Sequence, residues 1–303
     1  MRRVIGRAVA AALLALACAG ASASSIAFCD RATQPLSARQ HDLLLRFAAV
    51  VRAELEATDR ASAIVARSGL DLERFGQRYS HAGVSLRSSG NGPWSVRQLY
   101  FACDERVPRL YDQGMAGFVA GTEEAALGYV SILLLPPDSA QTLAQRALDN
   151  ASSLGLLGAA YSANAYPFSE RYQNCNQWVA ELLALAWGDL DAAEPDVRGV
   201  AQRWLHDAGY APTLFDASSL LLTIARPFVP WVHVDDHPDA DRTARRYLVS
   251  MPASIEAFVR AQLPGAQRIE ICHADDRVVV HRGWDPVGEG CVAGEGDRVI
   301  VLD

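Results

Sequence analysis

Two residues far apart in the chain, Cys175 and His81, carry the side chains that a thiol hydrolase needs. Cys175 follows the polar stretch RYQN and is the first residue of the apolar helical run CNQWVAELLALAWG. At the start of a helix, unpaired N–H groups and the helix dipole stabilise a thiolate, and the same N–H groups could donate to an oxyanion. A histidine base within hydrogen-bond distance would complete the machinery of nucleophilic catalysis. Free cysteine also packs like a small hydrophobe, so a structural role for Cys175 stays open.

His81 lies in the run YSHAGVSLR, which we predict to be a β-strand. Strand alternation places His81 on one face with Gly83 and Ser85, which leaves space beside the ring. The next strand-like run, WSVRQLYFA, offers Gln98 and Tyr100 on a common face. We predict that Gln98 orients the imidazole; the alternative is that it only lines the hairpin surface, because the sequence does not fix the register. Taken alone, a strand histidine is more often structural than catalytic.

The N-terminus has the layout of a cleavable secretory signal. Three arginines among the first seven residues precede the apolar run Ala8 to Leu16, and small residues then lead to Ala21-Ser22-Ala23. We predict cleavage after Ala23, and therefore a periplasmic or secreted protein whose mature chain has no transmembrane anchor. Two alternatives are an apolar N-terminal helix of the fold and a lipoprotein anchored at Cys18. The lipoprotein is the weaker one, because Ala15 stands where a lipobox has leucine.

Removal of residues 1–23 leaves five cysteines, an odd number for an oxidising compartment. We predict a disulfide between Cys272 and Cys291, which flank the C-terminal strands, and a second one between Cys29 and Cys103. This pairing leaves Cys175 as a free thiol, although four cysteines can pair in three ways. The odd count itself requires at least one unpaired thiol or an intermolecular bond.

Hydrophobic periodicity predicts the elements that position these residues. The helical ranges are about 36–57, 138–158, 175–187, 194–210 and 254–263. The strand-like ranges are about 62–69, 79–87, 94–102, 127–137, a hairpin over 268–284, and 297–303. Ser37 and Gln40 match a capping box at the start of the first helix, and Asn174 is the candidate N-cap of the helix that carries Cys175.

The order of the elements favours an α+β fold with an antiparallel sheet packed on helices, because strands and helices come in groups rather than in alternating βαβ units. We predict a signal peptide over residues 1–23, a main domain over residues 24–229, and a small α+β, strand-rich C-terminal region over residues 230–303. The composition of the sequence changes near the last boundary, where the stretch WVHVDDHPDADRTARR is rich in polar and turn-forming residues.

Composition excludes nucleic acid as a partner. All 28 basic residues are arginines, the net charge is −7, and no run of arginines forms a basic patch. The cluster HVDDH, from His233 to His237, holds metal-capable side chains, but its spacing fits neither the helical zinc motif nor a calcium loop. We predict a solvated acidic turn there, with no metal and no cofactor.

The irregular stretch YSANAYPFSERYQN places several aromatic side chains directly before Cys175. We predict that Asn174, Tyr166 and Tyr172 line a substrate cleft beside the thiol. The alternative is that the aromatic rings only pack the loop against the body of the protein, and the sequence does not separate these two roles.

These motifs resemble the circularly permuted papain-like (NlpC-like) fold of cysteine hydrolases, in which the histidine strand precedes the cysteine helix. YSHAGVSL and NCNQWVAELL carry that likeness in the order of the lecithin:retinol acyltransferase-like branch, the reverse of ordinary NlpC-type peptidases. Residues from about 29 to 188, including RSGLDLERFGQRYSHAGVSLR and YSANAYPFSERYQNCNQW, look like the domain of unknown function 2145 family, which carries no established activity.

The papain-like resemblance implies Cys175 as nucleophile, His81 as base, and a third polar residue on the following strand, for which we choose Gln98. The expected protein is an exported cysteine hydrolase of the amidase, peptidase or thioesterase type, acting on a small-molecule, peptide or lipid substrate. The strand after His81 carries no carboxylate, which departs from a Cys-His-Glu pattern. That departure favours the alternative of an inactive periplasmic binding or structural protein of the same fold. A lipid acyltransferase, with an apolar pocket beside Cys175, is the third possibility.

Overall fold

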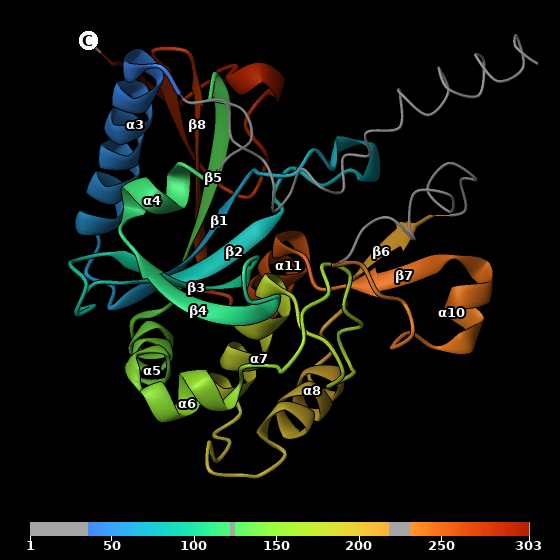
Figure 1. Cartoon of the computed structure of the whole chain (residues 1–303). Helices are drawn as coiled ribbons and strands as arrows, with labels where there is room; N and C mark the ends of the chain where they lie inside the picture. The colour runs from blue at the N-terminus through green and yellow to red at the C-terminus, as the bar shows by residue number, and fades with distance from the viewer. Residues whose placement is uncertain (1–35, 122–124, 218–230, 303) are drawn as a thin grey trace, which may run out of the picture. The chain divides into compact units, whose positions relative to one another are not determined.

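The computed structural model describes residues 36–121, 125–217 and 231–302. Its main element is an antiparallel sheet of eight strands in the order β10-β9-β8-β5-β1-β2-β3-β4 (Figure 1). The strands are β1 (Ser62–Arg67), β2 (His81–Leu86), β3 (Ser95–Ala102), β4 (Val107–Gln113), β5 (Leu127–Leu134), β8 (Gln267–Ala274), β9 (Arg277–Arg282) and β10 (Arg298–Val301). The fold is therefore α+β with a large antiparallel sheet, the class that the sequence predicts.

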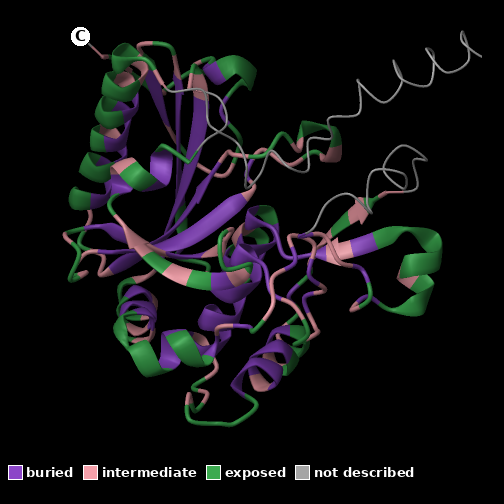
Figure 2. Cartoon of the chain, in the orientation of Figure 1, coloured by how far each residue is buried: buried purple, intermediate pink, exposed green. Residues whose placement is uncertain are grey.

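Helices cover both faces of this sheet. The helices of the described residues are α3 (Ala38–Glu56), α4 (Met115–Val119), α5 (Pro137–Leu148), α6 (Asn150–Gly155), α7 (Cys175–Trp187), α8 (Val197–Asp207), α10 (Asp239–Ala244) and α11 (Pro252–Gln262), with short 3₁₀ turns η1 (Glu73–Phe75) and η3 (Glu289–Cys291). Of these, α10 packs against β7 rather than on the main sheet. Because helices pack on both faces, β1 and β2 are buried along their whole length. Figure 2 shows this burial of the central strands and of α7.

One face of the sheet packs against α3 and α4. The apolar side chains of Phe47 and Val51 from α3 and Phe118 from α4 are fully buried in the core on this face. The capping box predicted for α3 is present: the Ser37 hydroxyl accepts from the backbone N–H of Gln40, and the Gln40 side chain accepts from the backbone N–H of Ser37.

The other face packs against α5 and α7, and α8 and α11 pack in turn against α7, which is central to this core. Every α7 residue from Cys175 to Ala186 is buried, because the helix contacts strands on one side and neighbouring helices on the other. The helix predicted over 138–158 is two helices. Asp149 ends α5 and starts α6, since its carboxylate accepts from the backbone N–H groups of Ala151 and Ser152.

The C-terminal strands complete the main sheet. β8 pairs with β5 from Leu134↔Gln267 to Leu127↔Ala274, and β9 and β10 follow outward. Residues beyond 230 therefore contribute β8, β9 and β10 to the same sheet as the preceding residues, because β8 pairs with the edge of β5. A second, two-stranded sheet joins β6 (Thr213–Asp216) and β7 (Arg246–Val249), and the short helix α10 directly precedes β7 (Figure 1).

The predicted disulfide between Cys272 and Cys291 is confirmed, with a Cα–Cα distance of 5.6 Å. It links β8 to η3. Cys103 is also disulfide-bonded, while its predicted partner Cys29 and the predicted signal peptide lie outside the described residues. Within the described part of the chain, no helix is both long enough and apolar enough to cross a membrane.

Candidate active site

The N-terminus of α7 is fixed by Asn174, the predicted N-cap. Its side-chain oxygen accepts from the backbone N–H of Gln177 at 2.7 Å, and its side-chain nitrogen donates to the carbonyls of Ala163 and Ser250. The next side chain, Asn176, donates to the carbonyl of Ser80 at 3.2 Å. Since Ser80 directly precedes β2, this bond attaches the start of the cysteine helix to the start of the histidine strand.

Cys175 is the free cysteine of the described residues, and only 7 % of its surface is exposed. The backbone N–H groups of Ala82, Asn176 and Cys175 lie close enough to the sulfur to lower its pKa, and the Arg67 guanidinium acts in the same direction. Burial is the larger effect and raises the pKa of the thiol to about 11. The expectation that the helix start would favour a thiolate is therefore wrong for the resting protein, because desolvation outweighs the N–H groups.

Gln98 contacts the imidazole of His81. The His81 Nε2 atom lies 2.7 Å from Gln98 Oε1, and Gln98 Nε2 donates to Gln113 Oε1 at 2.7 Å. Since the amide oxygen of Gln98 is an acceptor, Nε2 of the imidazole carries the hydrogen. The unprotonated nitrogen is then Nδ1, the atom that can accept a proton.

The space that Gly83 leaves is used by the sheet itself. A Cβ at Gly83 would lie 2.6 Å from Val96 Cγ1 and 3.0 Å from the Arg97 carbonyl oxygen, so glycine allows β3 to approach β2 closely. The sequence analysis expected open space beside the His81 ring. The close approach of β3 instead brings Gln98 to the imidazole.

The imidazole of His81 is neutral in this environment. It stacks on the ring of Tyr100 at 4.7 Å and lies 6.1 Å from the ring of Phe118. Burial and the nearby positive charge of Arg67 lower the pKa of His81 to about 3, and the hydrogen bond to Gln98 only partly opposes them. A neutral imidazole is the form that a general base requires.

Two further residues, Arg67 and Tyr161, lie close to the candidate catalytic residues and were not selected from the sequence. Arg67, the last residue of β1, is the register partner of His81 and donates to the Tyr100 hydroxyl at 2.7 Å. Tyr161 lies close to Cys175 and Tyr100, and burial raises the pKa of its phenol well above the usual value. The alternation in SAIVAR could have placed Arg67 on the buried face of β1, but its closeness to His81 depends on the strand register.

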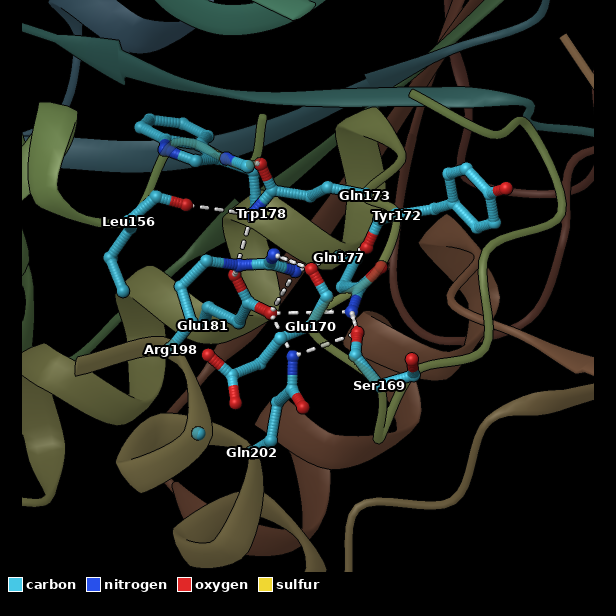
Figure 3. Close-up of polar contacts among 12 residues, drawn as sticks. Leu156, Ser169, Glu170, Tyr172, Gln173, Gln177, Trp178, Glu181, Arg198 and Gln202 are labelled. Atoms are coloured by element: carbon cyan, nitrogen blue, oxygen red, sulfur yellow. Dashed lines mark hydrogen bonds and ion pairs between the residues drawn. The ribbon is translucent and has the colours of Figure 1, made fainter. Parts of the chain in front are cut away.

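A buried carboxylate holds the segment before Cys175 in place. Glu181 of α7 is fully buried and accepts from four side chains (Figure 3). These are Gln173 at 2.5 Å, Gln202 at 2.7 Å, Arg198 at 3.0 Å and Gln177 at 3.2 Å. Arg198 in turn donates to the carbonyls of Glu170 and Tyr172, and Gln173 to that of Leu156. The cluster therefore connects α7 and α8 to the irregular segment that leads to the thiol.

The predicted cleft residues have structural roles. Asn174 is 2 % exposed and caps α7. The backbone N–H of Tyr166 donates to Asp236 at 2.8 Å, and the Tyr172 ring stacks on the His233 ring at 4.6 Å. The HVDDH cluster is only partly the solvated turn that the sequence predicts: Asp235 is exposed, whereas the side chains of Asp236 and His237 are fully buried against the segment before Cys175.

A cavity of about 1430 Å³ lies between the β1–β2 connection, α11 and β8. Its lining includes Gly69, Tyr79, Arg260 and Trp284, and it does not include Cys175, His81 or the three predicted cleft residues. Within the described ranges, no group of three or more histidine, cysteine, aspartate or glutamate side chains is arranged to hold a metal ion.

The sequence model of one protein family matches residues 54–259. That family is described as "Uncharacterized protein conserved in bacteria (DUF2145)". The match covers β1 to β5, α7 and most of α11, and so contains His81, Gln98 and Cys175. No curated protein and no solved structure matches the chain.

Proposed function

The chain belongs to the domain of unknown function 2145 family, and we propose that it is an exported cysteine hydrolase that cleaves an amide, ester or thioester. Cys175 is the nucleophile, His81 is the base, and Gln98 is the residue that orients the imidazole. One observation carries the proposal: the 2.7 Å contact between His81 Nε2 and Gln98 Oε1, which leaves Nδ1 as the basic atom. The hydrogen bond from Asn176 to Ser80 supports it, because it joins the cysteine helix to the strand of His81.

The proposed reaction starts from a neutral thiol and a neutral imidazole. His81 Nδ1 takes the thiol proton as the sulfur attacks the carbonyl carbon, because a thiol with a pKa of about 11 is not ionised beforehand. The Asn174 side chain accepts the N–H of Gln177, so the N–H groups of Cys175 and Asn176 stay free of the cap and lie near the sulfur. In the proposed reaction they donate to the oxyanion that forms on the attacked carbonyl. The imidazolium then protonates the leaving amine, alcohol or thiol.

The second half of the reaction releases the product. After the leaving group departs, the acyl group is bound to the Cys175 sulfur as a thioester. His81, neutral again, removes a proton from water as the water oxygen attacks that thioester. The carboxylic acid is released, and the proton returns to the sulfur. Export of this enzyme is supported by the signal-like N-terminus and by the disulfide between Cys272 and Cys291.

A second candidate function is a binding or structural protein without turnover. The raised pKa of the Cys175 thiol favours it, since an inert buried cysteine has this property as well. The third candidate, a lipid acyltransferase, needs an apolar pocket beside Cys175. The cavity of about 1430 Å³ does not provide that pocket, because neither Cys175 nor His81 lines it.

Acylation by p-nitrophenyl acetate tests the hydrolase. We expect peptide mapping by mass spectrometry to place an acetyl group on Cys175 of the wild-type protein, with release of p-nitrophenolate. The chain contains no lysine, so few other side chains compete for the acetyl group. His81→Gln should slow acylation by roughly a hundredfold or more, because general base catalysis contributes about that factor. Cys175→Ala should abolish labelling at this position.

The matched control is His206→Gln, which removes an exposed histidine of α8. It should acylate at the wild-type rate. If folded wild-type protein carries no acetyl group on Cys175, or if His81→Gln labels as fast as the wild type, the hydrolase is excluded and the non-catalytic protein becomes the better description.

A further inference from the structure

Arg67 is a buried cation without an anionic partner among the described residues. Only 5 % of its surface is exposed. Its guanidinium donates to two neutral oxygens, the Ser68 carbonyl at 3.1 Å and the Tyr100 hydroxyl at 2.7 Å. Its Nε atom is buried and has no hydrogen-bond partner. A buried charge that no described carboxylate pairs with is costly, so its retention beside a candidate nucleophile requires an explanation.

The surroundings hold the guanidinium in one place. It lies over the Phe118 ring, with Cζ at 5.7 Å from the ring centroid. A Cβ at Gly69 would be 2.7 Å from Nη1, and a Cβ at Gly121 would be 2.5 Å from Nη2. Glycine at both positions therefore leaves the room that the planar group occupies. A planar, fixed guanidinium is well suited to binding a carboxylate through two parallel hydrogen bonds.

The same guanidinium lies within electrostatic reach of both reacting groups. Arg67 is the register partner of His81, and its charge lowers the pKa of His81 and of Cys175. The two groups are neutral in the resting protein, so neither one compensates the charge of Arg67. The cavity of about 1430 Å³ reaches Ser68 and Gly69, the residues that directly follow Arg67 in the chain.

We propose that Arg67 binds a carboxylate of the substrate, so that the site takes anionic acyl compounds whose carboxylate lies close to the reacting carbonyl. This inference rests on the proposed function for the identity of the reacting atoms. The anion-binding role itself needs only the buried guanidinium and its unpartnered Nε. The C-terminal carboxylate of a peptide and the side-chain carboxylate of an acidic residue share this chemistry.

Two alkylating reagents that differ in charge test the inference. Iodoacetate and iodoacetamide both react with the thiolate, forming a sulfur–carbon bond and releasing iodide, so their rate ratio does not depend on how much thiolate is present. We expect the iodoacetate-to-iodoacetamide rate ratio at Cys175 to exceed that of free cysteine by about tenfold, because the carboxylate is attracted to Arg67. Arg67→Gln should remove this preference, and Arg67→Lys should retain most of it.

Arg109→Gln is the matched control, since it removes an exposed arginine of β4 that is paired with Glu105. Its ratio should equal that of the wild type. An equal loss of the preference in Arg109→Gln would overturn the inference, because net charge alone would then explain it. A wild-type ratio no higher than that of free cysteine would overturn it as well, while acetylation of Cys175 by p-nitrophenyl acetate would still support the hydrolase.

A binding measurement separates this inference from catalysis. In the Cys175→Ala protein, N-acetylglycine should shift the NMR signal of the Arg67 Nε–H, whereas the neutral N-acetylglycinamide should not. Glutarate and inorganic phosphate, tested in parallel, distinguish a peptide C-terminus from a side-chain carboxylate or a phosphate group. Absence of any shift with both carboxylates overturns the inference, and this outcome is independent of whether the thiol reacts.

Discussion

At the scale of single residues, the site combines a thiol and an imidazole that are both uncharged. Burial raises the pKa of Cys175 and lowers that of His81, because each change avoids a charge in a place that water does not reach. Arg67 opposes the first shift and adds to the second. The resting pair is therefore not an ion pair, and the charge separation of the proposed reaction develops only when the sulfur attacks.

The pKa of His81 can be measured directly. We expect the ring signals of His81 in two-dimensional NMR to show no inflection between pH 8 and pH 4.5, since burial and Arg67 lower its pKa to about 3. Gln98→Glu should raise this pKa, because a carboxylate at the Nε2 atom stabilises the imidazolium, whereas the amide of Gln98 does so only weakly.

A small histidine peptide in the same tube provides the reference for the pH scale. An inflection of the wild-type His81 signals close to the pKa of an unperturbed histidine, about 6.5, would contradict the burial of the ring. A Gln98→Glu variant with an unchanged pKa would contradict the contact between residue 98 and the imidazole.

The sequence could predict some of the contacts around His81 and Cys175 but not others. The position of Gln98 could be predicted from the sequence, because strand alternation and a regular hairpin place it across from the histidine strand. The position of Arg67 could not be predicted in this way, since its place beside His81 depends on the pairing of β1 with β2, and strand register is a tertiary property. The net pKa shift of Cys175 was predicted in the wrong direction, because a sequence shows a helix start but does not show how deeply it is buried.

At the scale of elements, the thiol is positioned by a helix and by the irregular segment before it. The Glu181 cluster ties α7 and α8 to the carbonyls of Leu156, Glu170 and Tyr172. Because the segment lies outside any helix or sheet, these side-chain hydrogen bonds add to its own backbone hydrogen bonds in fixing its conformation. The buried pair of Glu181 and Arg198 is thus expected to determine how well the N-terminus of α7 is defined.

Removal of the central carboxylate tests this dependence. Glu181→Ala should lower the free energy of unfolding by about 3–5 kcal/mol, because it leaves the Arg198 guanidinium buried without a counter-ion. Urea unfolding measures the loss. Limited proteolysis of the variant should in addition show faster cleavage between residues 156 and 174 than in the wild type.

Arg203→Ala is the control, because Arg203 is exposed and its ion pair with Asp196 should contribute about 1 kcal/mol or less. A Glu181→Ala protein as stable as Arg203→Ala would show that the cluster is not a structural determinant. Unchanged cleavage within 156–174 would show that contacts other than the Glu181 cluster hold this segment, such as the hydrogen bond from Tyr166 to Asp236.

The elements themselves were predicted unevenly, for physical reasons. α7 and its cap at Asn174 follow from strong periodicity and a good N-cap residue. β4 was missed because it is an edge strand with Pro108 inside and alternating exposure, which weakens the apolar pattern. The HVDDH cluster was placed in solvent because its composition is that of a turn. The burial of His237 in this cluster comes from packing against Tyr166 and Tyr247.

At the scale of the whole molecule, the sheet is covered by helices on both faces, and polar side chains are enclosed along with the apolar ones. His273 of β8 is fully buried against Phe47 of α3, with 4.5 Å between the ring centroids. Neither ring nitrogen makes a hydrogen bond of normal geometry to the described residues, and the nearby backbone and carboxylate of Asp275 only partly oppose the effect of burial on the pKa of His273. Burial lowers the pKa of His273, and so the ring is enclosed in its neutral form.

These buried histidines make the folded state sensitive to acid. His81 and His273 have lowered pKa values when folded, so the unfolded chain binds their protons first, near pH 6.5. Stability should therefore fall as the pH drops below about 6.5, by up to about 1.4 kcal/mol per pH unit for each histidine. His273→Leu should reduce the slope of unfolding free energy against pH just below pH 6.5, because burial lowers the pKa of His273 only in the folded state. The control Phe47→Leu should lower the free energy of unfolding without changing its slope against pH. Equal slopes in wild type and His273→Leu would show that protonation of the His273 ring is not coupled to unfolding.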